Sequence, residues 1–347
     1  MKTRACVLHG IGDVRIETRE IGNVGPRQVR VRIGAGGLCG SDIHYFRDGG
    51  IGTIRVSEPI ILGHEVAGTV EAVGGEVANV KPGQRVALCP SLPCGRCRFC
   101  QIGQQQHCLE MQFFGSAMRK PHCNGGFRDE IIVEDFQCVP VGDVGLNEAA
   151  CAEPLSVSLH AINNAGSVFG KRVLVMGAGP IGALLVGAAK LAGAQEIVAV
   201  DIADAPLNAA IRMGATTTVN ALAEPDSLAQ RYSADKGTFD VGFECTGAGV
   251  ALGTMFPVVK PRGTIVAVGV SSGAHIPFNA LVGKEIRLAG THRFHAEYPV
   301  AARMIAERRI DVRPIITATL PMDRIRDAFD VVRDRTSQMK VQLSFAT

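Results

Sequence analysis

Residues 172–182 read RVLVMGAGPIG, an apolar run that breaks at once into a glycine-rich turn. Residues 183–192 are then rich in Ala, Leu and Val, and a second apolar run at 196–200 ends in an aspartate. A short apolar run that ends in glycines is typical of a buried strand, and the longer Ala- and Leu-rich stretch is typical of a helix. The order strand, turn, helix, strand therefore predicts a βαβ unit, which joins two parallel strands.

The glycines of this turn favour a site for a dinucleotide. Gly177 permits the tight turn, Gly179 lets backbone N–H groups approach a pyrophosphate, and Gly182 lets the helix pack closely on the strand. Pro180 and Ile181 lie between the last two glycines, where the N-terminus of the helix faces the phosphates.

Asp201 supports the same interpretation from the other end of the unit. It ends the second strand about 20 residues after the glycines, where a carboxylate accepts hydrogen bonds from the adenosine ribose of NAD. The residues that follow directly, Ile202 and Ala203, include no arginine that could hold a 2′-phosphate. The sequence therefore predicts NAD as the cofactor, in preference to NADP.

The composition limits the class of protein. A chain of 347 residues exceeds a single typical core, so two domains are expected. The net charge is only +3 and the basic residues are scattered, which argues against nucleic-acid binding. No apolar run reaches membrane-spanning length, and the apolar residues 5–8 are too few for a signal peptide. We expect a cytoplasmic protein that binds neither nucleic acid nor membrane.

The pattern of expected elements changes along the chain. Short β-type runs alternate with Gly and Pro turns at 4–36, 61–74 and 84–88, which predicts a β-rich, partly barrel-like domain. Later in the chain, strands alternate with helices, and six strands are expected at 172–176, 196–200, 217–219, 240–244, 264–268 and 286–289. We therefore expect an α/β protein with a doubly wound parallel sheet over 153–289 and a second domain built from 1–152 and 290–347.

Four of the eleven cysteines crowd into one loop at about 89–110. Their spacing is Cys94-x2-Cys97-x2-Cys100-x7-Cys108, among Gly, Pro and charged residues. Four thiolates so close together suit a closed tetrahedral zinc site, in which the protein fills every position and no substrate can enter. We expect a structural zinc there rather than disulfides, because the chain is long and the number of cysteines is odd.

A second set of possible metal ligands is dispersed along the chain and comprises Cys39, His64, Glu65 and Glu153. Each has an ordinary explanation when taken alone, as a buried thiol, a satisfied histidine or a surface carboxylate. Spacing does not decide between these explanations and a joint metal site, because catalytic ligands scattered along a chain leave no short motif.

The order of these segments, with the four-cysteine loop and the glycine turn, resembles the zinc-dependent medium-chain alcohol dehydrogenase family over essentially the whole chain. The motifs CGSDIHY at 39–45 and EPLSVSLH at 153–160 are similar to its polyol (sorbitol) dehydrogenase branch. The loop FFGSAM at 113–118, followed by PH at 121–122 and GGF at 125–127, is similar to L-idonate 5-dehydrogenases. The resemblance implies a GroES-like catalytic domain, a Rossmann domain that binds NAD, and a homo-oligomer, either a dimer or a tetramer.

The resemblance also implies roles for the dispersed residues. Cys39 and His64 match the first two ligands of a catalytic zinc ion. The third ligand is either Glu65, which binds directly in the polyol branch, or Glu153, whose position acts through water there. Asp42 matches a carboxylate that orients His64. Together with the four-cysteine loop, this makes two zinc ions per chain.

Further positions match the family's path for the proton and its substrate pocket. Ser41 matches the hydroxyl that receives the substrate proton, and His44 matches the outlet to solvent. Tyr45, Arg293 and Phe294 match positions that line the substrate pocket. An open zinc site lowers the pKa of a substrate hydroxyl, and hydride then passes to the nicotinamide.

Three functions stay open on the sequence. The first is NAD-dependent oxidation of a sugar acid, with L-idonate to 5-keto-D-gluconate as the leading candidate, and the second is a sorbitol- or xylitol-type polyol dehydrogenase. The third is a non-catalytic nucleotide- and zinc-binding protein, against which the full set of ligands argues. A sugar acid would need a cationic partner for its carboxylate, and the candidates are Arg293, Arg119, Lys120 and His122.

Overall fold

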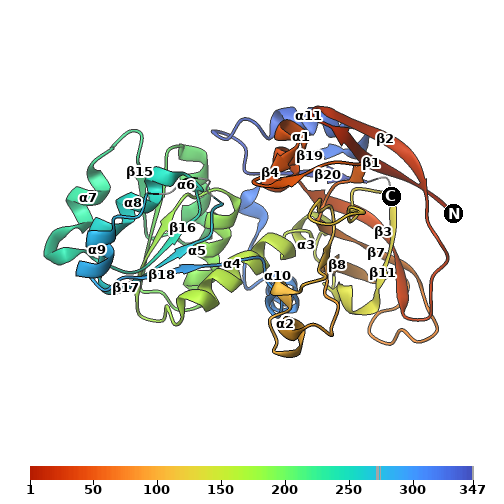
Figure 1. Cartoon of the computed structure of the whole chain (residues 1–347), viewed down its shortest axis with the longest axis horizontal. Coiled ribbons are helices and arrows are strands. Elements are labelled where there is room, and N and C mark those ends of the chain that lie inside the picture. Colours follow the sequence, from red (N-terminus) through yellow and green to blue (C-terminus); the bar gives the residue numbers. More distant parts are fainter. Residues whose placement is uncertain (271–272, 274, 346–347) are drawn as a thin grey trace.

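The computed structural model describes residues 1–270, 273 and 275–345. Two halves lie side by side along its longest axis (Figure 1). One half is an α/β structure built from the middle of the chain, and the other is rich in strands and holds both chain ends. The α/β class expected from the sequence is confirmed.

In the part of the chain that the structure describes, the middle segment forms a six-stranded, all-parallel sheet with the order β15-β14-β13-β16-β17-β18. In that order its strands are Thr217–Asn220, Glu196–Asp201, Arg172–Met176, Phe239–Glu244, Val259–Ala267 and Arg287–Gly290. The chain runs outwards from β13 in both directions, which is the doubly wound order. The six expected strands are confirmed, although β17 begins earlier than expected.

Alternate residues of β13 face two different cores, because successive side chains of a strand point to opposite faces. Val173 and Val175 pack into a core that includes the helices α4, α5 and α6, which span Ala152–Ala165, Pro180–Leu191 and Asp204–Met213. Leu174 and Met176 pack into a core that includes α7, α8 and α9, which span Ser227–Tyr232, Gly249–Val258 and Phe278–Gly283. The sheet is therefore covered on both faces, as parallel sheets require.

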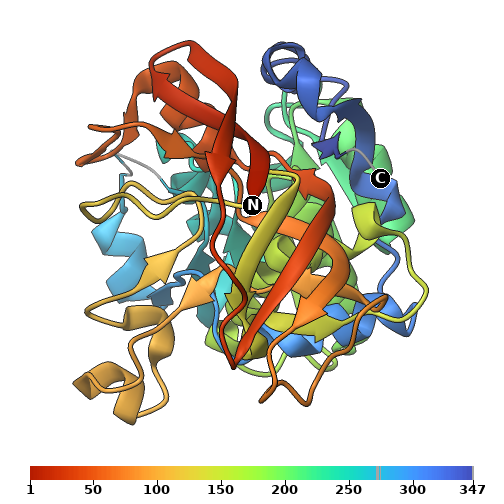
Figure 2. The same ribbon diagram turned by 90° about the vertical axis from the view of Figure 1, so that its right-hand side faces the viewer.

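The strand-rich half contains, among its described residues, a seven-stranded sheet with the order β12-β8-β7-β3-β20-β19 and with β11 paired to β3. These strands span Cys138–Pro140, Arg85–Leu88, Glu65–Val73, Gln28–Gly37, Lys340–Ser344, Ile316–Pro321 and Glu130–Glu134. A smaller sheet has the order β2-β1-β6, with the bounds Asp13–Glu20, Lys2–Gly10 and Ile60–Ile61. Figure 2 shows the N-terminal strands of this half in red and orange, crossing in front of the viewer. Because β20 pairs with β3, residues 340–344 join a sheet that is built mainly from residues 28–140.

The segment 61–74, expected as one β-type run, is divided by a bend. β6 ends at Ile61 and β7 begins at Glu65. Between them, Gly63 has a φ of +93°, in the left-handed region, and a Cβ at this position would lie 2.1 Å from the ring of Phe127. Only glycine fits such a position. The bend matters because it carries His64 between the two strands.

The remaining elements are shorter or lie at the edges of the two halves. The helices α1, α2, α3, α10 and α11 span Gly40–Asp48, Arg98–Gln101, Leu146–Ala149, Glu297–Ala306 and Ile325–Val331. The strands β4, β5, β9 and β10 span Gly50–Ile51, Ile54–Arg55, Ser91–Leu92 and Gln112–Phe113. Short 3-10 helices occur at Gln105–His107, Asp135–Gln137, Ala234–Lys236, Arg313–Ile315 and Met322–Arg324. Across the described residues, no helix has both the length and the apolar character needed to span a membrane.

Candidate active site

The N-terminus of α1 and the bend before β7 are held together by Asp42. Cys39 precedes the helix in extended backbone, and its N–H donates to Oδ2 of Asp42 at 3.0 Å. The other oxygen, Oδ1, accepts the N–H of Gly63 at 3.2 Å and lies 4.0 Å from Nδ1 of His64. Asp42 is fully buried. A carboxylate behind a histidine in this way is typical of metal sites, where it fixes the ring orientation.

Cys39, His64 and Glu65 form a compact cluster, in which the ligand atoms all lie within 4.8 Å of one another. Burial raises the pKa of the Cys39 thiol to about 11, and the charge of Glu65 acts in the same direction. The thiolate therefore needs a nearby cation. Thiolate, imidazole and carboxylate are the ligands that zinc takes in proteins, and three of them leave one position for substrate. The cluster fits a catalytic zinc ion.

Lys340 belongs to this cluster and was missed by reasoning from the sequence. Its Nζ donates to both carboxylate oxygens of Glu65 at 2.7 Å each and to the carbonyl of Leu38 at 3.2 Å. Gly37 makes room for the pair, because a Cβ there would lie 2.1 Å from Oε2 of Glu65. The signal in the sequence was weak, since Lys340 is a single lysine in a short β-type run, 275 residues away from Glu65.

Glu153 lies in the first turn of α4 and is only 5% exposed. Burial raises its pKa to about 8, with Glu65 and Cys39 acting in the same direction and His64 opposing. Glu153 is therefore close enough to interact electrostatically with the residues of the cluster. Among the described residues, however, the compact set of possible ligands does not include it. The geometry favours Glu65 over Glu153 as the direct ligand.

Ser41 and His44 lie on α1 beside the cluster. A hydrogen bond from Ser41 favours the thiolate form of Cys39 and so opposes the rise in its pKa that burial causes. Nδ1 of His44 lies 2.8 Å from Oδ2 of Asp48, which fixes the ring and leaves Nε2 for another partner. The side chain of His44 is 42% exposed, so it has access to solvent.

Two of the predicted substrate-binding residues meet the loop at 113–118. The hydroxyl of Tyr45 accepts the N–H of Ala117 at 3.2 Å, which leaves its proton available to a ligand. The guanidinium of Arg293 lies 4.0 Å above the ring of Phe113, a distance typical of a cation–π contact. Its Nη2 also contacts the sulfur of Met118 at 3.1 Å.

Arg293 is positioned by its own backbone and faces the acidic part of the site. Its φ of +52° is unusual for a residue other than glycine. Burial lowers the pKa of Arg293, while electrostatic interactions with Glu153 and Tyr45 oppose this, so the three groups lie near one another. The next residue, Phe294, is fully buried and packs against Tyr298, with 5.6 Å between the ring centroids. The ring of Phe294 thus supports this segment from inside.

The other cations considered for a substrate carboxylate lie elsewhere. Arg119 and Lys120 are exposed. His122 is buried, and both of its ring nitrogens have partners: Nε2 accepts the N–H of Ser57 at 3.0 Å, and Nδ1 lies 2.6 Å from the carbonyl of Arg119. His122 is therefore a neutral imidazole that has no N–H left for a carboxylate.

The four-cysteine loop has the geometry of a closed site. The sulfurs of Cys94, Cys97, Cys100 and Cys108 lie within 4.8 Å of one another, and all eleven described cysteines are free. Cys97 Sγ is 3.6 Å from Cys100 Sγ and 4.0 Å from Cys108 Sγ, which brackets the roughly 3.8 Å that a tetrahedral site with Zn–S bonds of about 2.3 Å requires. The N–H of Glu110 points at Cys108 Sγ, at 3.4 Å. The loop fits a structural zinc ion.

The glycine turn between β13 and α5 has the shape expected for a pyrophosphate site. Gly177 has a φ of +91°, and a Cβ at Gly182 would lie 1.8 Å from the carbonyl of Gly177. A Cβ at Gly179 would meet no atom within 4 Å, so open space lies over the turn. Pro180 is the first residue of α5 and Ile181 the second, so the N–H groups of this first turn face that space.

Asp201 holds the glycine turn from the end of β14. Its Oδ2 accepts the N–H of Ala178 at 2.8 Å, and its Oδ1 accepts the N–H groups of Ile202 at 2.7 Å and Ala203 at 3.2 Å. An ionised carboxylate has about four acceptor positions, so capacity remains for a ribose hydroxyl.

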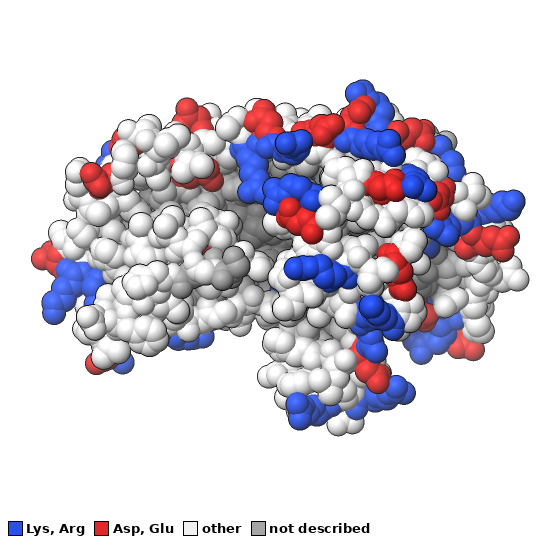
Figure 3. Space-filling model, turned by 45° about the horizontal axis from the view of Figure 1, so that its top comes forward, with Lys and Arg blue, Asp and Glu red and all other residues white. Residues whose placement is uncertain are grey.

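The space-filling view shows a hollow between the two halves of the molecule, with basic side chains at its upper edge (Figure 3).

A closed four-thiolate site, an open Cys/His/Glu site and a dinucleotide turn at the edge of a doubly wound sheet together define a class of enzyme. Such an enzyme is a zinc-dependent dehydrogenase that acts on a CH–OH group with NAD or NADP. The comparisons with known families agree: residues 25–143 match the alcohol dehydrogenase GroES-like domain, and residues 180–307 match the zinc-binding dehydrogenase domain. The chain belongs to the zinc-containing medium-chain alcohol dehydrogenase family, in its polyol dehydrogenase branch.

Three relatives illustrate this placement. The chain is 39% identical to L-idonate 5-dehydrogenase (NAD(P)(+)) of Escherichia coli, with 99% of both chains covered, and the crystal structure of the E. coli L-idonate 5-dehydrogenase superposes with a TM-score of 0.93. It is 34% identical to L-idonate 5-dehydrogenase of Vitis vinifera, with 98% of this chain and 94% of that protein covered. It is 36% identical to sorbitol dehydrogenase of Pongo abelii, with 94% and 92% covered. The chain is therefore a zinc-dependent polyol or sugar dehydrogenase, which excludes the non-catalytic alternative.

Proposed function

We propose that this enzyme oxidises the C5 hydroxyl of L-idonate to give 5-keto-D-gluconate, with NAD as the hydride acceptor. The observation that carries the proposal is the place of Arg293, a partly buried guanidinium near Tyr45 and Glu153. In the described residues it forms no ion pair, and its partners are the ring of Phe113 and the sulfur of Met118. An arginine has five N–H donors, so most of them remain for a substrate carboxylate.

The candidate zinc ligands would hold the reacting end of the substrate. Cys39, His64 and Glu65 would bind zinc directly, with Glu153 behind them, and zinc bound there supplies the Lewis acidity that lowers the pKa of a substrate hydroxyl. Lys340 holds Glu65 in place through both carboxylate oxygens, at 2.7 Å each. The carboxylate of L-idonate lies at the opposite end of the molecule from C5, so a cation some distance from the cluster is what this substrate needs.

Residues of α1 would carry the proton away. Oγ of Ser41 receives the proton of the substrate hydroxyl, and Nε2 of His44 passes it to solvent, because Nδ1 is occupied by Asp48. The hydroxyl of Tyr45 orients the substrate chain. The reacting carbon and the nicotinamide must be held at reacting distance with water excluded. In this proposal, substrate and nicotinamide would meet in the hollow between the two halves.

The preference for NAD rests on Asp201. Its carboxylate lies at the end of β14, where it would accept hydrogen bonds from the hydroxyls of an adenosine ribose and repel a 2′-phosphate. The next charged residue in the chain is Asp204, which adds to the repulsion. Two of the relatives bear names that point to L-idonate, and these names support the choice of substrate.

The ratio of kcat/KM for L-idonate to that for sorbitol tests the proposal. A charge-assisted hydrogen bond to a carboxylate is worth about 1.5–3 kcal/mol, so the acid should be preferred by roughly ten- to a hundredfold. Arg293→Met should abolish most of this preference, whereas Arg119→Met, which removes an exposed cation from the neighbouring loop, should leave the ratio unchanged. If sorbitol turns over as well as L-idonate, the enzyme is a polyol dehydrogenase instead.

A further inference from the structure

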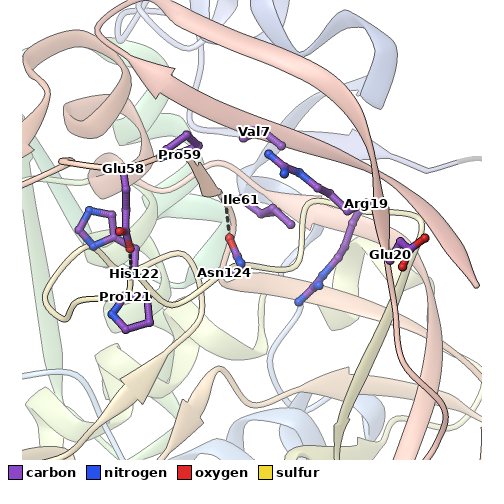
Figure 4. A pocket seen from close by; sticks show the side chains of 10 residues that line it. Val7, Arg19, Glu20, Glu58, Pro59, Ile61, Pro121, His122 and Asn124 are labelled. Atoms are coloured by element: carbon purple, nitrogen blue, oxygen red, sulfur yellow. Dashed lines mark hydrogen bonds between the residues drawn. The ribbon is translucent and has the colours of Figure 1, made fainter.

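A second hollow, of about 480 Å³, lies in the strand-rich half and shares no residue with the zinc or dinucleotide sites (Figure 4). Its walls come from β1, β2 and the segments 58–61 and 121–128, which lie far apart in the sequence. Arg19, Asn124 and Arg128 line it. The hollow is large enough for a small polar molecule, and its lining includes several N–H donors.

Arg128 is the unusual residue of this hollow. Its Nε is buried without a hydrogen-bond partner, and within the described part of the chain its guanidinium takes part in no ion pair. The neighbouring carboxylate of Asp129 is engaged by Arg4 at 2.8 Å and 3.3 Å. Burial lowers the pKa of Arg128 to about 10, which is still far above neutrality. A guanidinium that is charged, half-buried and unpaired is costly, and buried arginines are normally paired with an acceptor.

Two further groups could donate into the same space. Oδ1 of Asn124 accepts the N–H of Ile61 at 2.9 Å, which fixes the side chain and leaves its NH2 group for another acceptor (Figure 4). Arg19 contributes a second guanidinium, of which Nη2 contacts Glu17 at 2.7 Å and the other N–H groups remain. These donors come from different elements, so the fold itself brings them together.

Within the described structure, neither acidic residue that lines this hollow forms an ion pair with Arg128. Glu58 accepts the N–H of His122, so its carboxylate holds the 121–128 segment in place. Glu20 is exposed. His122 is neutral and has both ring nitrogens bonded to the backbone. In the described residues, Nε of Arg128 therefore has no hydrogen-bond partner although two carboxylates line the same hollow.

We propose that this hollow binds a small oxyanion such as a phosphate group, with Arg128 as its anchor and with Asn124 and Arg19 as supporting donors. Guanidinium groups recognise phosphate and carboxylate oxygens through two parallel hydrogen bonds. The volume of the hollow, about 480 Å³, is larger than the volume of one phosphate ion, so the site has room for a phosphate monoester as well. The site is separate from catalysis and does not depend on the substrate proposed above.

Isothermal titration of inorganic phosphate into the zinc-loaded enzyme tests the site, with saturating NADH present to fill the dinucleotide site. Chloride at equal ionic strength serves as the reference for unspecific binding. We expect phosphate to bind, Arg128→Met to weaken it by roughly ten- to a hundredfold, and Arg19→Met to weaken it less. Arg262→Met is the matched control, because it removes the same charge from a side chain that is 85% exposed in the other half.

Arg128→Met should keep the wild-type kcat/KM, which shows that the variant is folded. If it does not fold, Arg128→Lys and Arg19→Met decide the matter, and both must weaken phosphate binding. Glycerol 3-phosphate that binds more tightly than phosphate, with the same loss in the Arg128 variant, supports the proposal with a monoester as ligand. Phosphate binding that is absent, matched by chloride, or equal in the wild type and the Arg128 and Arg19 variants would overturn it.

Discussion

Lys340→Met removes the positive charge that faces Glu65 while keeping the length of the side chain. Nζ lies 2.7 Å from each carboxylate oxygen, and unit charges at this separation attract by about 6 kcal/mol at an effective dielectric constant of about 20. Desolvation cancels much of this gain, but removing one partner leaves an uncompensated buried charge. We therefore expect the variant to lower the free energy of unfolding of the zinc-free protein by about 3–5 kcal/mol.

Urea unfolding of the chelated protein measures this loss as a lower midpoint at an unchanged slope. Lys260→Met is the matched control, because Lys260 pairs with Asp240 at the surface and is 46% exposed, so its loss should stay below about 1 kcal/mol. The double variant Lys340→Met/Glu65→Gln should recover about 2 kcal/mol, because it also removes the stranded carboxylate. Equal losses in the two lysine variants, or additive losses in the double variant, would refute the reasoning.

Three further predictions concern the metal sites and the dinucleotide turn. Cys39→Ala should abolish turnover and lower the zinc content from two ions per chain to one, with the fold intact. Cys97→Ala should mainly lower the melting temperature. A single zinc ion in the active wild-type chain would contradict both expectations. Asp201→Asn should weaken the preference for NAD in kcat/KM, and equal values for NAD and NADP in the unmodified enzyme would show that this carboxylate does not select the cofactor. Gly182→Ala should unfold at lower temperature and bind NAD poorly, because its Cβ would lie 1.8 Å from the carbonyl of Gly177; wild-type affinity for NAD in calorimetry would argue against this close packing.

The parts of the fold that could be predicted are those with a local signal. The glycine turn is one continuous segment of the sequence, and so is the four-cysteine loop. The strands of the parallel sheet are apolar runs because both faces of the sheet are covered. The bend at Gly63 was not predicted, since it depends on the ring of Phe127, which reaches it from elsewhere in the chain. Cys39 and His64 could be proposed only from the resemblance to a family, because their meeting depends on the register of β3 and β7.

Lys340 and Arg128 could not have been found from the sequence for a related reason. Lys340 reaches Glu65 only because β20 pairs with β3. The two residues are 275 positions apart in the sequence, and no local sequence pattern extends over such a separation. In the sequence, no pattern distinguishes Arg128 from an ordinary solvent-exposed arginine. What sets it apart is that its buried Nε has no hydrogen-bond partner within the described structure, and a missing partner leaves no pattern in a sequence.

The most direct test of the proposed reaction is product analysis after incubating the zinc-loaded enzyme with L-idonate and NAD. The absorbance of NADH and the NMR spectrum of the sugar acid are followed in the same sample. We expect one NADH for each 5-keto-D-gluconate formed, with no other oxidised position. A ketone at another carbon, or no NADH from L-idonate under conditions in which sorbitol is oxidised, would contradict the proposal.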